Sequence, residues 1–380
     1  MSSNTGPDDR SHTPATPLRR AVLAGLFVVS ALGAEATAPA SQLGEESRQV
    51  GAVSRRGSGA GAGAAHGVPA GQELPGEPVP ASFAGGLVDL LPTTEAGTAL
   101  RLCTDSGGGA LVVRERVARE EGWLEGEAAG ASVPFPGFRP GESVPAPVAV
   151  PPRLRVLPDS VDAPIEDDCD GFLGAPWFAG KSWTMNYPAG RLLHHPDGLP
   201  NGLTGDTVPL GFQADSAGRH TSHFPRIDVV VDGDSLSLLL DTGARLRPGE
   251  RARRALGVSP DGPGTVATSF IAAPVFRRWR RRHPGWEVVP DAGTFYPGQP
   301  MIRVPSVTVG DVRVGPVWFT RRPARNFLRG MSRWMDVPVV GALGGSALRY
   351  LRISISYPAE RAVIARPARA GPTASPPAGR

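Results

Sequence analysis

The fold is decided by residues 236–244, which read Leu-Ser-Leu-Leu-Leu-Asp-Thr-Gly-Ala. The leucine-rich run is typical of a buried strand, and this strand leads directly into a charged residue, Asp241. Burying a carboxylate is costly unless it is paired or hydrogen-bonded. A glycine two residues later allows a sharp turn. The stretch therefore predicts a strand that delivers an acidic side chain into a tight turn.

A second stretch of the same kind lies upstream, at residues 99–109, which read Ala-Leu-Arg-Leu-Cys-Thr-Asp-Ser-Gly-Gly-Gly. Its strand-like run ends at Asp105. No other Asp-Ser-Gly or Asp-Thr-Gly triplet occurs in the chain. Each triplet is followed by an arginine-rich stretch, at residues 114–122 and 249–257, for which we predict a short helix.

Downstream of each triplet the chain repeats itself at a constant offset of 170 residues. Gly-Phe-Leu-Gly at 171–174 matches Gly-Ala-Leu-Gly at 341–344, and Tyr-Pro-Ala-Gly-Arg at 187–191 matches Tyr-Pro-Ala-Glu-Arg at 357–361. The alternation of residues 351–357 is typical of a strand with one buried face. Such a duplication predicts two structurally similar halves.

The second half is longer than the first. The two aspartates are separated by 136 residues and the later blocks by 170, so the second copy carries 34 additional residues between its aspartate and its Gly-Ala-Leu-Gly block. We place this insertion at residues 258–300 and expect it to form a surface excursion. After it, residues 302–319 alternate like a hairpin with a turn at Gly310-Asp311.

A strand entering Asp-Thr/Ser-Gly, followed by two apolar residues and a glycine, resembles the signature of pepsin-like and retropepsin-like aspartic peptidases. The resemblance covers residues 82–366 and rests on short blocks. It implies an all-β bilobal pepsin-like fold, with two similar β-barrel-like lobes and a few short helices. We assign residues 81–203 to the N-terminal lobe and 204–370 to the C-terminal lobe.

The resemblance also implies roles for single residues. Asp105 and Asp241 would be the catalytic pair that activates a water molecule. Ser106 and Thr242 would tie the two loops together. Gly107 and Gly243 would let each loop approach the opposite carboxyl group.

Further support residues follow from the same resemblance. Gly174 and Gly344 would let a crossing strand pack beneath each catalytic loop. The segments that carry Cys103 and Cys169 are neighbours in the family fold, which makes a disulfide beneath the first loop an expectation. Two buried free thiols remain the alternative.

The two ends of the chain have a different composition. A pair of arginines, an apolar run over residues 21–34 and the small residues around position 36 predict a signal peptide over residues 1–36. Residues 37–80 are expected to be a disordered linker or leader, and residues 371–380 a disordered tail. We therefore expect an exported protein, periplasmic or secreted, with no stable membrane span after signal cleavage.

Bulk properties and the other motifs exclude several classes. The formal charge of +4 is spread along the chain, so we expect no nucleic-acid partner, even for the arginine run at 277–282. His194, His195, His220 and His223 do not have the spacing of a known zinc motif, so we expect no metal and no cofactor. Nucleophile-elbow, P-loop and dinucleotide-binding motifs are absent from the sequence.

The sequence therefore predicts a monomeric aspartic endopeptidase acting on a peptide or protein substrate. Two alternatives stay open. The fold could serve as a non-catalytic peptide-binding protein, or the Asp241 lobe could be active only as a homodimer, as in retropepsins.

Overall fold

The computed structural model describes residues 74–159, 168–294 and 298–367. Most regular elements in these ranges are strands, and the helices are short. None of the described helices combines the length and the apolar character needed to cross a bilayer. The expected signal peptide, most of the expected leader and the expected tail lie outside the described residues.

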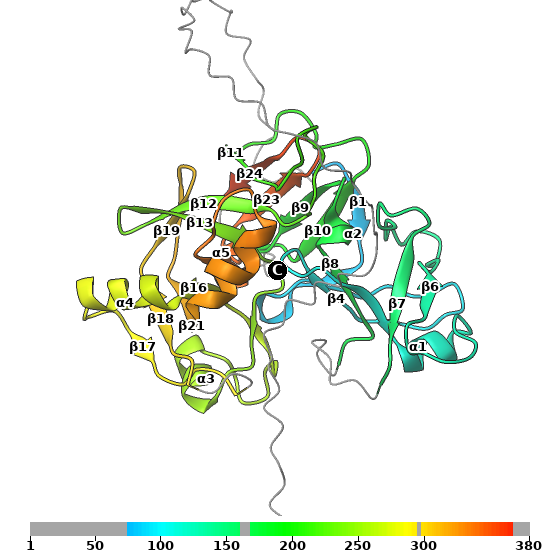
Figure 1. Ribbon diagram of the computed structural model, residues 1–380, viewed down its shortest axis with the longest axis horizontal. Coiled ribbons are helices and arrows are strands. Elements are labelled where there is room, and N and C mark those ends of the chain that lie inside the picture. Colours follow the sequence, from blue (N-terminus) through cyan, green and yellow to red (C-terminus); the bar gives the residue numbers. More distant parts are fainter. Residues whose placement is uncertain (1–73, 160–167, 295–297, 368–380) are drawn as a thin grey trace, which may run out of the picture.

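Residues of the first half form a seven-stranded sheet, to the right in Figure 1. Its strands in spatial order are β2 (Ala81–Ser82), β3 (Asp89–Leu90), β4 (Leu102–Asp105), β8 (Gly171–Gly174), β5 (Leu111–Arg114), β7 (Arg153–Leu157) and β6 (Ser132–Pro134). The predicted helix after the first triplet is present as α1 (Glu115–Glu120).

Residues of the second half form a nine-stranded sheet, to the left in Figure 1. Its strands in spatial order are β17 (Val288–Val289), β18 (Met301–Val304), β21 (Val317–Arg322), β16 (Ser269–Ala272), β22 (Gly341–Leu343), β13 (Asp234–Leu240), β12 (Arg226–Val231), β19 (Val307–Val309) and β20 (Val312–Val314). The predicted hairpin turn at Gly310-Asp311 joins β19 to β20. The predicted second helix is α3 (Glu250–Leu256), and a two-stranded ribbon of β14 (Arg245–Leu246) and β15 (Val266–Ala267) lies beside it.

Both halves contribute to a third, six-stranded sheet, which lies between the other two at the top of Figure 1. Its order is β1 (Glu77–Val79), β10 (Arg191–His195), β9 (Ser182–Asn186), β23 (Arg352–Ser356), β24 (Arg361–Ala365) and β11 (Asp206–Pro209). The central pair is β9 and β23, in which Thr184 lies opposite Ser354. Their hydroxyl oxygens are 2.8 Å apart.

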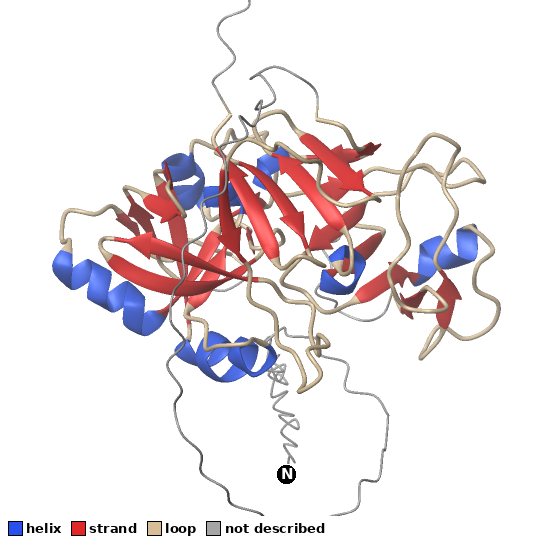
Figure 2. Cartoon of the chain, turned by 90° about the horizontal axis from the view of Figure 1, so that it is seen from above, coloured by secondary structure: helices blue, strands red, loops and turns tan. Residues whose placement is uncertain are grey.

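The elements that follow Gly174 and Gly344 correspond one to one. β23 begins and ends 170 residues after β9, and β24 begins and ends 170 residues after β10. Helix α5 (Gly345–Leu348) likewise follows α2 (Ala175–Phe178) at this offset. The all-β architecture with two similar halves is therefore confirmed, and Figure 2 shows strands as the main regular elements, with short helices among and around them.

Two expectations about burial were wrong. Strand β23 was predicted to have one buried face, but Ser354 and Ser356 are buried as well as Ile353 and Ile355, because the shared sheet is covered on both sides. The insertion at 258–300 was predicted to form a surface excursion. Instead this range supplies β16, which lies in the middle of the nine-stranded sheet. Strand β16 pairs with β21 and β22 as β5 pairs with β7 and β8, so it belongs to the repeat and the predicted location of the insertion was wrong.

The same range also supplies α4 (Ala273–Arg282), which follows β16 as α1 follows β5 and whose apolar face packs into the core. Its side chains Val275, Phe276 and Trp279 are buried, and the Trp279 ring meets Phe319 of β21 edge-on with 5.3 Å between centroids. The arginines that dominate the sequence of this helix obscured its apolar stripe.

Candidate active site

Asp105 and Asp241 occupy equivalent places in the two lobes. Asp105 is the last residue of β4, and Asp241 follows directly after β13. Each of these strands pairs in parallel with the strand of the later glycine block, β4 with β8 and β13 with β22. The same local topology therefore places both carboxyl groups where the two lobes meet.

The loop glycines bring the two carboxyl groups together. A Cβ atom on Gly107 would lie 2.7 Å from Cγ of Asp241, and one on Gly243 would lie 2.6 Å from Oδ1 of Asp105. Real Cβ atoms do not come this close to other atoms. Each loop therefore packs its glycine directly against the carboxyl group of the other lobe, and no larger residue fits at either position.

Hydroxyl residues tie these loops to one another. The backbone N–H of Ser106 donates to Oγ1 of Thr242, and that of Thr242 donates to Oγ of Ser106, each at 3.0 Å. The hydroxyl of Ser106 also donates to the carbonyl oxygen of Leu240 at 2.7 Å. Ser106 and Thr242 are both buried. The contacts fix the relative position of the two acidic side chains.

Burial and proximity alter the acidity of the pair. Asp241 is only 8% exposed, and burial raises the pKa of its carboxyl group well above the ordinary value, with the neighbouring Asp105 raising it further. Burial also raises the pKa of Asp105, although a hydrogen bond to Asp241 and backbone N–H groups of the loop lower it in part. Two carboxyl groups in this situation share one proton, and the proton belongs to the pair.

Three polar residues near the pair were not predicted from the sequence. Tyr187 and Tyr357 are buried directly after β9 and β23, and burial raises the pKa of both hydroxyls, with Asp241 adding to the effect at Tyr187 and Asp105 at Tyr357. Arg245 is the third, and its charge lowers the pKa of both carboxyl groups. The two tyrosines belong to the repeated blocks, and the arginine lies two residues after Gly243. Their places in these motifs were the sequence features that could have identified them.

The other two glycines lie where strands cross beneath the loops. A Cβ atom on Gly174 would lie 2.6 Å from the carbonyl oxygen of Ala110, and one on Gly344 would lie 2.5 Å from Cβ of Ala244. Neither glycine has a left-handed backbone conformation. Close packing, rather than an unusual turn, therefore accounts for the absence of a side chain at both positions.

The structure joins Cys103 and Cys169 by a disulfide with 5.8 Å between the Cα atoms. Both cysteines are buried, with 1% and 0% exposure, beside Val112 and Leu157. Because Cys103 lies on β4 two residues before Asp105, the disulfide braces the strand that carries the first aspartate.

The histidines and the arginine run are separate from this pair, and several of their side chains have partners of their own. His195 contacts Oγ1 of Thr184 at 2.8 Å, and His220 contacts Glu360 at 2.8 Å. In the described part of the chain no three His, Cys, Asp or Glu side chains converge in a way that could hold a metal ion. From the arginine run, Arg278 and Arg282 pair with Asp234 at 3.0 and 2.9 Å.

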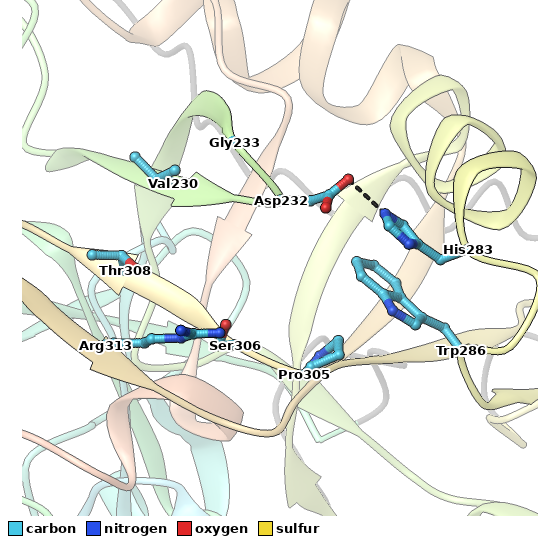
Figure 3. Close-up of a pocket in the computed structure, with 9 residues that line it drawn as sticks. All are labelled: Val230, Asp232, Gly233, His283, Trp286, Pro305, Ser306, Thr308 and Arg313. Atoms are coloured by element: carbon cyan, nitrogen blue, oxygen red, sulfur yellow. Dashed lines mark hydrogen bonds and ion pairs between the residues drawn. The ribbon is translucent and has the colours of Figure 1, made fainter.

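A cavity of about 390 Å³ lies on the second lobe (Figure 3), and neither Asp105 nor Asp241 lines it. Its walls come from the β12–β13 turn, the segment after α4 and the β18–β20 region. Two of its ionisable groups contact each other, since His283 lies 2.5 Å from Asp232, and the His283 ring stacks on Trp286 with 4.1 Å between ring centroids. It contains none of the residues that the sequence singled out for catalysis.

Comparisons with known proteins add little. No protein-family model matches the chain, and no curated protein matches it. Among solved structures, the crystal structure of an aspartic proteinase from Irpex lacteus is similar, with a TM-score of 0.43 and 12% sequence identity over 77% of this chain and 97% of that one. A likeness at this level assigns no function.

Proposed function

We propose that this chain is an aspartic-type endopeptidase in which Asp105 and Asp241 share one proton and activate one water molecule. The observation that carries the proposal is the reciprocal packing of Gly107 against Asp241 and of Gly243 against Asp105. This arrangement places two buried carboxyl groups of raised pKa side by side, as general acid–base chemistry on a peptide bond requires.

The reaction follows from the shared proton. The ionised carboxyl group takes a proton from the water, whose oxygen attacks the carbonyl carbon of the peptide. The protonated carboxyl group donates a hydrogen bond to the oxyanion that forms. When the tetrahedral intermediate collapses, a proton passes to the leaving nitrogen and the pair returns to its singly ionised state. This division of labour is general to aspartic proteases, and none of its steps requires a covalent intermediate or a metal.

Both members of the proposed pair come from one polypeptide, which supports a monomeric enzyme over the retropepsin-like homodimer. We also propose that the protein acts after export, on an extended peptide or protein substrate. Its mass by size-exclusion chromatography with light scattering would test the first point, since a dimer required for activity would contradict it.

Cleavage of an acid-denatured protein substrate tests the proposal directly. We expect cleavage in the acidic range, inhibition by pepstatin, and loss of at least about 100-fold in kcat for Asp241→Asn and for Asp105→Asn. Asp261→Asn, which alters an exposed carboxyl group of the second lobe, serves as the matched control and should retain full activity. A folded wild-type protein that binds peptides without cleaving them would identify the chain as a peptide-binding protein instead.

A further inference from the structure

Arg245 crosses from the second catalytic loop to the first lobe. Its Nε donates to the carbonyl oxygen of Gly243 at 3.2 Å, and its Nη1 lies 3.4 Å from Sγ of Cys103. Its Nη2 is buried and has no hydrogen-bond partner among the residues that the structure describes. The guanidinium group therefore lies next to both strands that carry the aspartates, and one of its donors is unused.

The charge of this group lacks a direct counter-ion. Within the described ranges Arg245 makes no ion pair, and its contacts are a carbonyl oxygen and a disulfide sulfur. A partly buried cation without an anion is costly. Its charge acts on Asp105 and on Asp241, lowering the pKa of both against the effect of burial. The singly ionised pair is thus the anion that balances Arg245.

The other ionisable groups near the pair do not supply the negative charge that would balance Arg245. Tyr187 and Tyr357 stay neutral, because their raised pKa values keep the hydroxyls protonated. Beyond the disulfide, Arg101 pairs with Asp89 at 2.7 Å. The Nε of Arg114 donates to the carbonyl oxygen of Cys169 at 3.2 Å.

We propose that Arg245 is a positioning residue whose charge stabilises the singly ionised form of the Asp105–Asp241 pair and thereby sets the acidic pH range in which the pair works. The inference rests on the proposed function for its catalytic consequence, whereas its effect on proton binding by the pair does not depend on turnover. The guanidinium group acts through the two aspartates and takes no part in bond making.

Two variants separate charge from shape. Arg245→Met keeps an unbranched side chain without charge, and Arg245→Lys keeps the charge. In protein labelled with ¹³C-aspartate, with the two signals assigned from the single Asp→Asn variants, the carboxyl titrations of Asp105 and Asp241 are followed by NMR. We expect both to move to higher pH in the Met variant and to stay near the wild type in the Lys variant.

The pH profile of kcat/KM supplies the second measurement. Removing the cation raises both pKa values, so both limbs of the profile should move to higher pH, and activity at the wild-type optimum should fall about tenfold. Titrations that coincide in Arg245→Met and wild type would overturn the proposal, as would a Lys variant that behaves like the Met variant. Arg245→Gln replaces the Met variant if the latter does not fold. If the wild type cleaves nothing while the NMR shift is present, the proposed function fails and the assignment of Arg245 stands.

Discussion

Ser106 and Thr242, which are 136 residues apart, each donate a backbone N–H to the hydroxyl oxygen of the other at 3.0 Å. The bonds join the two lobes at the point where their acidic side chains meet. The two hydroxyl groups differ in their other contacts, because the hydroxyl of Ser106 also donates to the carbonyl oxygen of Leu240.

This asymmetry predicts different costs for the two alanine substitutions. Ser106→Ala leaves the N–H of Thr242 and the carbonyl of Leu240 without these partners, and we expect a loss of about 1–3 kcal/mol in the free energy of unfolding. Thr242→Ala removes the acceptor of one N–H and should cost less. Urea unfolding measures both, with Ser106→Thr as the control that keeps the hydroxyl. Equal losses in the two alanine variants would contradict the prediction.

Asp241→Asn should stabilise the protein at neutral pH while abolishing activity. The folded state holds the proton of Asp241 more tightly than the unfolded state, so stability is full below the ordinary aspartate pKa and is lost as pH rises through the raised value. The amide cannot ionise and avoids this loss. We expect a gain of about 0.5–2 kcal/mol at pH 7 that disappears near pH 3. Thermal unfolding at several pH values measures it, and a gain independent of pH would refute this origin.

Gly243→Ala should displace the catalytic pair, because its Cβ atom would collide with Asp105. Small shifts of reacting groups can cost about 100-fold in rate, and we expect a loss of this size in kcat together with about 1–3 kcal/mol in stability. Gly285→Ala is the matched control, since a Cβ atom there has no neighbour within 4 Å. Activity retained by Gly243→Ala would show that the loops are farther apart than described.

The disulfide should contribute substantially to stability. It joins cysteines 66 residues apart, and the loop-entropy model gives about 4 kcal/mol for a loop of this length. The Cys103→Ala/Cys169→Ala double variant should therefore unfold at lower urea concentration than the wild type. A reductant should lower the stability of the wild type and leave the double variant unchanged; an equal effect on both proteins would rule out this contribution.

Tyr187→Phe should be neutral or stabilising by up to about 1 kcal/mol. The hydroxyl of Tyr187 is buried and finds no hydrogen-bond partner in the described part of the chain, so its removal relieves a desolvated polar group. Tyr350→Phe is the comparison, because its hydroxyl donates to the carbonyl oxygen of Pro316 at 2.9 Å and its loss should cost about 1 kcal/mol. If both substitutions destabilise equally, Tyr187 has a partner in solution, such as a bound water.

Much of the fold was predictable because its signals are local. The leucine run before Asp241 and the block at 341–344 define strands β13 and β22 through the pattern of apolar residues alone. The proximity of Asp105 and Asp241 followed from a resemblance carried by short motifs. The tie between Ser106 and Thr242 could be expected in the same way.

Other features depend on contacts between distant parts of the chain. Nothing near Arg245 in the sequence indicates that its guanidinium group reaches Cys103, 142 residues earlier. Strand β16 is a short apolar run just before the arginine run at 277–282, and only its pairing with β21 and β22 places it in the core. Local patterns report which face of a segment is apolar, and they do not report which segment will cover that face.

The register of the seam between β9 and β23 carries a consequence for how the chain is assembled. Trp183 lies opposite Ile355 and Met185 opposite Ile353. Because Ile353 and Ile355 are the repeat equivalents of Trp183 and Met185, the pairing is symmetric about the Thr184–Ser354 pair. An interface of this kind is isologous, the form taken by two identical subunits related by a twofold axis. The edge each half presents is self-complementary, and a single half used twice has the geometry to close the same sheet.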